Sequence, residues 1–476
     1  MADGHGATVS TGGRLGERGP FRAPRAAAGE LAGRVTGELP GWLRGRLVRT
    51  APARFRSGAW EAAHWFDGLG MLYAFELGEG GARLVHRDLD SETARATAAG
   101  RRDIAGFATP MKRSLWARLL QPIPSVPDNT NVNVVPRGDG FAALTETSRQ
   151  LRVDAATLAV TGEHRWGDAL GPLSGTAHPV FDRGRRVWVD VCTDLGFRPG
   201  LAVIEHDPDG RARTLVARWK TPSLPYVHSF GVTERSVVIV AHPLTLNPAR
   251  MLFSDKGYAD HFAWADAEMQ LVIVDRATGA TRTVTAPKGF VFHVADAFED
   301  DRGLTLDAVA YDDASVIDQL RAGPLTGGPV RVSPRALRYR VPRGAKAATV
   351  EALSPEGFEF PVVDRRGAGD RRFTWGARLV LDGERSTSTL VALDGAARTE
   401  ATHAEDDWVF GEPVFARRPG SGEEGDGVLL TVGSHNRDDR ALLRVLDARS
   451  LRVLAGVEVD VPLPLGFHGG FAPARP

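Results

Sequence analysis

Four histidines that lie far apart in the chain constrain the fold of this sequence more than any other feature. Each stands in an apolar, strand-like stretch: His178 in GTAHPVFD, His228 in LPYVHSFGV, His293 in GFVFHVADAF and His468 in PLGFHGGF. Only a closed fold with many long-range contacts can bring such distant side chains together. Imidazole ligands without cysteine suit a divalent transition metal such as iron. The pattern therefore predicts a non-haem metal site built from all four rings.

Three glutamates have equally distinctive surroundings: Glu146 in ALTETS, Glu359 in FEFP and Glu412 in GEPVF. Histidines that bind a metal usually donate their second ring N–H to a carboxylate, which fixes the tautomer. A carboxylate in an apolar strand is costly unless it is paired or hydrogen-bonded. We interpret the three glutamates as such partners. Exposure on the outer face of a strand is the alternative, and the sequence does not say which glutamate serves which histidine.

Hairpin patterns, in which two β-rich runs flank an Asp/Gly turn, recur along the chain. Their turns fall near residues 80, 155, 208, 277, 394 and 448. Most intervals are roughly 55 to 75 residues, at the long end of known repeat periods. The interval from 277 to 394 has room for one more unit, which makes about seven. An all-β ring of four-stranded blades around a channel is the simplest arrangement of such units.

Composition excludes several classes of protein. Lysine plus arginine and aspartate plus glutamate number 59 each, so no basic excess supports nucleic-acid binding. Cys192 is the single cysteine, which fits a reducing cytoplasm. No apolar run approaches the roughly 18 residues of a transmembrane helix. Residues 1–30 are rich in Gly, Ala and Arg and predict a disordered leader, followed by one folded domain over 31–476.

Eight segments resemble the motifs of the carotenoid cleavage oxygenase family, in the family's order from about Leu39 to Phe471. They are HWFDGLGMLYAFEL, PDNTNVNV, LTETS, GTAHPVFD, YVHSFGVTE, FEFP, GEPVF and FHGGF. The resemblance implies a seven-bladed β-propeller with Fe(II) (the ferrous ion, Fe²⁺) on its axis, held by the four histidines. Three of them would be backed by glutamates. It also implies cleavage of a conjugated C=C bond with O2 to two carbonyl products, with no catalytic side chain beyond the metal centre.

Substrate selection would then depend on the shape of a tunnel beside the metal. We expect Thr145, Tyr226, Tyr311 and Phe107 to line it, although each aromatic could equally be a core residue. Stilbene-cleaving relatives carry a lysine immediately before the glutamate that matches Glu146, whereas this chain has Thr145. That difference favours an apolar polyene. The motifs look closest to the retinoid-forming branch, so a carotenoid or apocarotenoid is expected, with retinal among the candidate products.

Alternative functions stay open at this point. One is cleavage of a stilbene or another phenylpropanoid, a second is a propeller scaffold without catalysis, and a third is isomerisation of a retinyl ester. An inactive scaffold would purify without stoichiometric iron. One departure from the family is RTAPARF, Arg49 to Phe55, where relatives have a glycine-containing turn; we expect it to touch no ligand. Another histidine, His242 in VAHPL, has a context that could be mistaken for that of a ligand.

The stretch 111–123, MKRSLWARLLQPI, predicts an amphipathic basic helix. Its apolar face carries Leu115, Trp116, Leu119 and Leu120, and its charges are Lys112, Arg113 and Arg118. Such a helix can lie in a membrane interface, where a lipid-dissolved substrate would enter. A helix packed on the propeller face is the alternative. We therefore expect a cytoplasmic protein with peripheral membrane contact through 111–123.

Overall fold

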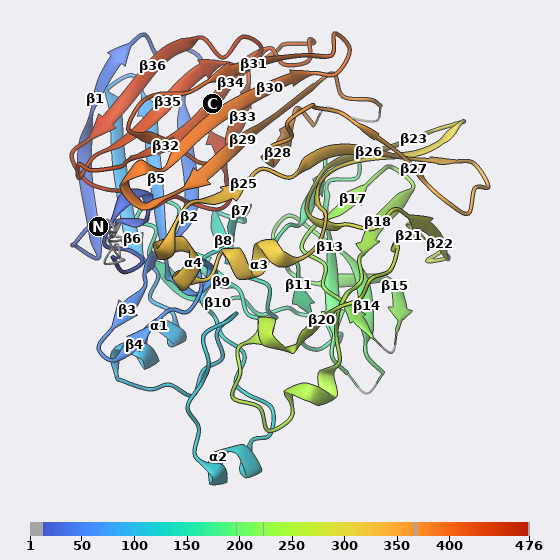
Figure 1. Ribbon diagram of the computed structural model, residues 1–476. Coiled ribbons are helices and arrows are strands. Elements are labelled where there is room, and N and C mark those ends of the chain that lie inside the picture. Colours follow the sequence, from blue (N-terminus) through green and yellow to red (C-terminus); the bar gives the residue numbers. More distant parts are fainter. Residues whose placement is uncertain (1–12, 197, 222, 366–368, 475–476) are drawn as a thin grey trace, which may run out of the picture.

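The computed structural model, which describes residues 13–196, 198–221, 223–365 and 369–474, is a ring of seven antiparallel blades (Figure 1). From the channel outward, blade one holds β37 (Gly469–Pro473), β2 (Gly45–Arg54), β5 (Leu69–Gly78) and β6 (Gly81–Asp88). Blade two holds β7 (Asn133–Arg137), β8 (Gly140–Leu144), β9 (Leu151–Val153) and β10 (Val160–Glu163). In blade three, β11 (Ser174–Gly175) and β12 (Val180–Asp182) share the neighbour β13 (Val187–Asp194), followed by β14 (Gly200–His206) and β15 (Arg213–Lys220).

The remaining four blades continue the ring. Blade four holds β17 (Phe230–Val232), β18 (Ser236–Ala241), β21 (Met269–Asp275) and β22 (Thr281–Ala286). Blade five holds β23 (Phe290–Asp300), β24 (Gly303–Tyr311), β26 (Arg335–Pro342) and β27 (Thr349–Ala352). Blade six pairs β25 (Val330–Val332) and β28 (Glu359–Val363) with β29 (Phe373–Leu381), then β30 (Thr387–Asp394) and β31 (Thr399–His403). Blade seven pairs β32 (Trp408–Phe410) and β33 (Val414–Arg417) with β34 (Gly427–His435), then β35 (Ala441–Asp447) and β36 (Val453–Val459).

Both ends of the chain take part in closing the ring. The C-terminal strand β37 pairs with β2, with Phe471 opposite Leu47, so that blade one combines the two ends of the chain. At the outer rim, β1 (Ala28–Gly37) pairs with β36 of blade seven and with β6 of blade one. Closure removes the free sheet edges that an open array would expose. The innermost strands then surround a common axis.

Apolar residues between the blades form the core, because the middle strands of each blade are covered on both faces. Strand β34 is buried along its whole length, and β24 is buried except at its two ends. Strands covered on both faces read as nearly continuous apolar runs rather than alternating ones. Each fully buried Val, Leu or Phe contributes about 1.5–3 kcal/mol relative to exposure. One large cluster joins blades seven and one, and another joins blades four and five.

The expected propeller is confirmed. All six turns expected from the hairpin pattern join the two outermost strands of a blade, as in β5–β6 and β35–β36. The long interval contains the seventh hairpin, β26–β27, with Tyr339 opposite Val350. The loop of that hairpin, 343–348, contains Gly344 but no aspartate, so its pattern stands out less clearly.

The expected boundary of the leader at residue 31 is too late for the described part of the chain. Residues 1–12 lie outside the described residues. After them, Leu15 and Phe21 are buried, and Phe21 packs edge-on against Trp65. Strand β1 already begins at Ala28. These two apolar residues hold the segment against the folded domain. The high Gly, Ala and Arg content of the segment makes them difficult to recognise in the sequence.

Short helices and an accessory sheet lie outside the blades. They are α1 (Glu92–Ala98), α2 (Leu115–Leu120), α3 (Ser315–Gln319), α4 (Ala322–Gly327), and the sheet of β16 (Leu224–Pro225), β19 (Leu244–Leu246) and β20 (Phe262–Trp264). The single-turn 3-10 helices are η1 (Gly19–Phe21), η2 (Trp65–Asp67), η3 (Pro248–Met251), η4 (Tyr258–His261) and η5 (Gly383–Arg385), and a small hairpin joins β3 (Arg56–Ser57) to β4 (Trp60–Glu61). None of the helices in the described part of the chain has the length and hydropathy of a bilayer-spanning segment.

The helix expected over 111–123 is shorter than its pattern suggests. It begins after Ser114, whose hydroxyl accepts the N–H of Ala117, and ends before Gln121. Pro122 and Pro124 follow and disfavour helical backbone in the residues before them. Figure 1 shows α2 at the tip of an arm that projects from the rest of the molecule, at the lower edge of the view.

Candidate metal centre

All four predicted histidines lie at the beginning of innermost strands. His178 stands two residues before β12, His228 two residues before β17, and His468 immediately before β37. His293 lies near the start of β23, where the register with β24 shifts. Because these strands begin at the same end of the channel, the side chains meet on the axis.

The imidazole nitrogens converge closely. His178 Nε2 and His228 Nε2 are 3.0 Å apart, and His293 Nε2 and His468 Nε2 are 3.2 Å apart. One ligand nitrogen from each of the four lies within 4.8 Å of all the others. Two nitrogens bound about 2.1 Å from one ion at right angles would be about 3.0 Å apart. The spacing therefore fits a single metal ion.

Three of the histidines hold a carboxylate on their other ring nitrogen. His228 Nδ1 is 2.5 Å from Glu146, His293 Nδ1 is 2.6 Å from Glu359, and His468 Nδ1 is 2.8 Å from Glu412. These contacts assign each glutamate to a histidine, which the sequence left open. Among the described residues, no carboxylate contacts the His178 ring.

The carboxylates determine where the ring protons lie. An ionised carboxylate only accepts hydrogen bonds, so the Nδ1 atoms of His293 and His468 carry the protons. When each ring carries only that proton, the two Nε2 lone pairs face each other across 3.2 Å. Two such acceptors repel each other unless a cation lies between them. The geometry itself therefore indicates a cation site.

Electrostatics favour neutral rings at His178 and His468 and ionised carboxylates at Glu359 and Glu412. Burial lowers the pKa of His468 to about 4, although Glu412 opposes the shift. Burial and the neighbouring imidazoles also place the pKa of His178 well below its usual value. Burial alone would raise the pKa of Glu359, but His293, the Phe360 N–H and the Tyr311 hydroxyl together outweigh it and hold the pKa below its usual value. Neutral imidazoles beside ionised carboxylates are the protonation states that metal binding requires.

Each glutamate has a further partner. The Tyr226 hydroxyl donates to Glu146 at 2.9 Å, and the Tyr311 hydroxyl donates to Glu359 at 3.1 Å. Both tyrosines were expected to line the tunnel, and in addition they hold the carboxylates in place.

Arg49 is the partner of Glu412, with Nη1 at 2.7 Å from the carboxylate and Nη2 donating to the Phe467 carbonyl at 2.6 Å. Arg49 belongs to the segment Arg49 to Phe55, which was expected to touch no ligand. It touches no histidine directly, but it supports the carboxylate on His468. Nothing in the motif could reveal this, because Glu412 lies at the other end of the chain.

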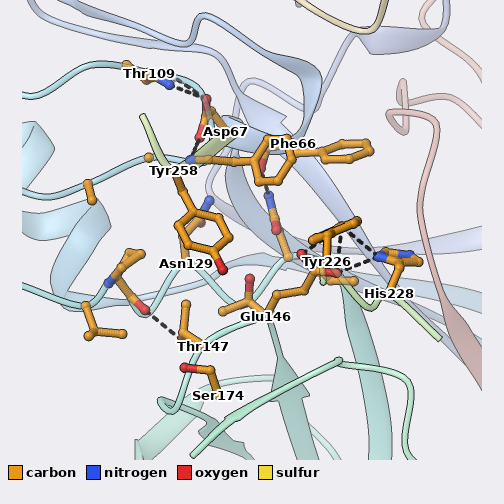
Figure 2. A pocket seen from close by; sticks show the side chains of 18 of the residues that line it. Phe66, Asp67, Thr109, Asn129, Glu146, Thr147, Ser174, Tyr226, His228 and Tyr258 are labelled. Carbon is orange, nitrogen blue, oxygen red and sulfur yellow. Dashed lines mark hydrogen bonds and ion pairs between the residues drawn. The ribbon is translucent and has the colours of Figure 1, made fainter. Parts of the chain in front are cut away.

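A cavity of about 260 Å³ opens beside the rings of His228, His293 and His468. It is lined by Thr145, Tyr226, Tyr311 and Phe107, the four residues expected in the tunnel. Much of its remaining wall is aromatic, including Phe66, Phe292 and Phe467. Figure 2 shows Tyr226 and His228 together beside Glu146, and the Tyr226 hydroxyl lies within hydrogen-bond distance of both. The wall also contains polar residues, among them Arg101, Arg102 and Lys256.

Other buried histidines lie outside the centre. His242 resembles a ligand in sequence, but it packs against Phe290 and Tyr226 and is not part of the cluster. His64 caps η2 by accepting the N–H of Phe66, and its Nε2 contacts the Ile317 carbonyl at 2.8 Å. Burial therefore does not distinguish the four clustered histidines from the other buried histidines, whereas the sequence motif around each one does.

A seven-bladed ring with four imidazoles on its axis defines a class of β-propeller able to hold a metal ion through histidines alone. The comparisons identify the family. The family model described as retinal pigment epithelial membrane protein matches residues 22–473. Carotenoid cleavage dioxygenase 8 homolog A, chloroplastic, of Oryza sativa subsp. japonica is 31% identical over 92% of this chain and 85% of its own length. The chain belongs to the carotenoid cleavage oxygenase family.

Two further comparisons agree. Carotenoid-cleaving dioxygenase, mitochondrial, of Pongo abelii is 28% identical over 95% of this chain and 93% of its own length. The crystal structure of cobalt-substituted Synechocystis ACO superimposes with a TM-score of 0.83 at 23% identity, and covers 96% of this chain and 98% of that one. At this identity the structural likeness supports the fold alone.

Proposed function

We propose that this protein is an Fe(II)-dependent dioxygenase that cleaves one conjugated C=C bond of a carotenoid or apocarotenoid with O2. The observation that carries the proposal is the convergence of four imidazole nitrogens within 4.8 Å of one another. Imidazole donors suit iron, and the relatives named above are carotenoid-cleaving dioxygenases. The overall reaction converts one C=C bond and one O2 into two carbonyl groups.

His178, His228, His293 and His468 would hold the iron, which, when bound, supplies activation of O2 toward the double bond. The protein's own groups supply placement. Glu146, Glu359 and Glu412 keep the proton of each partner ring on Nδ1. The cavity walls hold one double bond of the substrate beside the centre and exclude water. No side chain needs to act as acid, base or nucleophile, so regioselectivity depends on the shape of the cavity.

The cavity favours a polyene over a phenol. Its wall combines Phe107, Tyr226 and Tyr311 with Thr145 in the position where stilbene-cleaving relatives carry lysine. A threonine has no cation to stabilise a phenolate. The retinal-sized products expected from the sequence remain a proposal, as does cleavage of a stilbene as the second candidate.

Expression in cells that accumulate a single carotenoid tests the proposal. We expect loss of colour and a pair of matching aldehydes or ketones in the chromatogram, which would also locate the cleaved bond. Purified protein should contain about one iron per chain. Retention of colour by iron-loaded protein that cleaves a hydroxystilbene would favour the second candidate. Absence of iron after purification would instead favour a scaffold.

We also propose that α2 and the residues after it dock on a membrane surface. The side chains of Leu115, Trp116 and Leu120 are 65, 73 and 84% exposed, so the alternative of a helix packed on the propeller is not supported. The cavity wall includes Ile123, which lies three residues after the end of α2 and is itself 62% exposed. A lipid-dissolved substrate would therefore pass from the bilayer into the cavity along this arm. The cytoplasmic location expected from the single cysteine stays a prediction.

Replacing Trp116 and Leu120 with serine should weaken binding to phosphatidylcholine–phosphatidylserine vesicles by about 100-fold or more. Each buried apolar side chain contributes about 1.5–3 kcal/mol, and a tenfold change corresponds to about 1.4 kcal/mol. Co-sedimentation with vesicles measures the change. Leu215→Ser is the matched control, because Leu215 is also an exposed leucine but lies on β15 at the rim of blade three. Equal binding by both variants would contradict the proposal.

A further inference from the structure

The orientation of His178 has no explanation in the carboxylate pattern. The other three histidines each have a glutamate on Nδ1, whereas His178 has none among the described residues. Without such a partner, the His178 ring needs another constraint to stay oriented toward the other three imidazoles. The backbone around His178 provides one.

Thr176 connects His178 to a buried carboxylate. The Thr176 hydroxyl accepts the backbone N–H of His178 at 3.2 Å and donates to Asp190 Oδ1 at 3.0 Å. The same oxygen of Asp190 accepts the N–H of Val191 at 2.8 Å. Thr176 and Asp190 are only 3 and 5% exposed, so solvent does not compete for these contacts.

Two features of the neighbouring backbone belong to the same arrangement. Ala177 has a φ of 59°, in the left-handed region that residues with a Cβ rarely adopt. The bond from the His178 N–H to the Thr176 side chain closes a turn across Ala177 and holds this conformation. Gly175 has no Cβ, and one placed there would lie 2.6 Å from Asp190 Oδ2. Because Gly175 has no side chain, the Asp190 carboxylate can occupy this space.

We propose that Asp190 and Thr176 are positioning residues for the metal centre, which act on His178 through its backbone in place of the missing glutamate. Strand β13 carries Asp190 beside β11, where Gly175 pairs with Cys192. The position of the His178 Cα, and with it the reach of the ring, is thus set by a neighbouring strand of the same blade. The inference rests on the proposed function, because it assumes that the four histidines bind iron.

Binding of Co(II), followed by its visible absorption in the chelator-treated full chain, tests the inference without turnover. Thr176→Val keeps the shape of the side chain and removes the hydroxyl. We expect it to weaken Co(II) binding by about 10- to 100-fold, the usual effect of losing an outer partner of a ligand. Thr176→Ser restores the hydroxyl and should bind Co(II) within about twofold of the wild type. The wild-type absorption bands should change in the valine variant and persist in the serine variant.

A second route to the same change is Gly175→Ala, which displaces the Asp190 carboxylate without altering Thr176. It should reproduce the weaker Co(II) binding, and it tests the role of Asp190 even if the valine variant fails to fold.

Thr233→Val is the control, since Thr233 is a buried threonine whose hydroxyl accepts the N–H groups of Arg235 and Ser236 in a turn outside the cavity wall. Wild-type affinity and absorption in folded Thr176→Val, or in Gly175→Ala, would overturn the inference. Failure of the wild type to bind Co(II) or iron would instead contradict the proposed function.

Discussion

Replacing His293 with alanine is expected to abolish metal retention and turnover together. The substitution removes one of four ligand nitrogens and also leaves Glu359, whose side chain is 3% exposed, without its ring partner. Loss of an outer partner alone typically costs about 10- to 100-fold in metal affinity, so loss of a ligand should exceed about 100-fold. Metal analysis of the purified protein and product formation from a carotenoid measure the two effects.

The matched control for His293 is His242→Ala. Both side chains are buried in the same region and both pack near phenylalanines, but His242 is not part of the cluster. The control variant should lose some stability, because removing the imidazole leaves an empty space in the core. It should keep the iron content and the product pattern of the wild type. Normal iron occupancy with turnover in His293→Ala would remove this residue from the proposed centre.

The sequence was sufficient to predict the local units of the fold. Each outer hairpin, such as β21–β22 around residues 275–281, consists of two apolar strands and a turn that are contiguous in the chain. The histidines could be recognised for a similar reason, since the motif that surrounds each one is also contiguous. Patterns that are contiguous in the chain can be recognised without knowing how the blades are arranged around the ring.

The pairing of side chains across blades could not be predicted. Glu359 reaches His293 from blade six to blade five, and Glu412 reaches His468 from blade seven to blade one, so both pairs depend on how the ring closes. Arg49 was missed for the same reason, because its partner is 363 residues away. The length of α2 was overestimated since helical periodicity continued into a segment that Pro122 and Pro124 end.

The three glutamates also differ in a way that only the structure reveals. Glu146 and Glu359 receive neutral tyrosine hydroxyls, whereas Glu412 receives a guanidinium. Among the three, Glu412 therefore has a charge-compensating partner besides its histidine. Burial alone would raise the pKa of Glu412, but His468 and Arg49 outweigh it and hold the pKa below its usual value. The position of His468 thus depends on an ion pair between the two ends of the chain.

Replacing Arg49 with methionine should lower the free energy of unfolding by about 3–5 kcal/mol at pH 7.5, the usual effect of removing one member of a buried ion pair. Methionine keeps the apolar stem of Arg49, whose side chain is 3% exposed, and leaves Glu412 charged and uncompensated. Denaturant unfolding followed by tryptophan fluorescence, with metal removed by chelator, measures the loss. Arg83→Met should change stability little, since the Arg83 side chain is 54% exposed and solvent screens its ion pairs with Glu30 and Glu76.

The dependence on pH and a second substitution distinguish this mechanism from simple loss of packing. In the wild type, the lowered pKa of Glu412 contributes stability above the usual carboxylate pKa, and this contribution is lost as the pH falls through the folded-state value. Without Arg49, burial raises that pKa, so the variant should be least stable relative to wild type near neutral pH and approach it in acid. Adding Glu412→Gln removes the uncompensated charge and should recover most of the lost stability at pH 7.5, while metal affinity stays low because His468 has lost its carboxylate. A stability difference that is independent of pH and unaffected by Glu412→Gln would show that Arg49 acts through packing rather than through its charge.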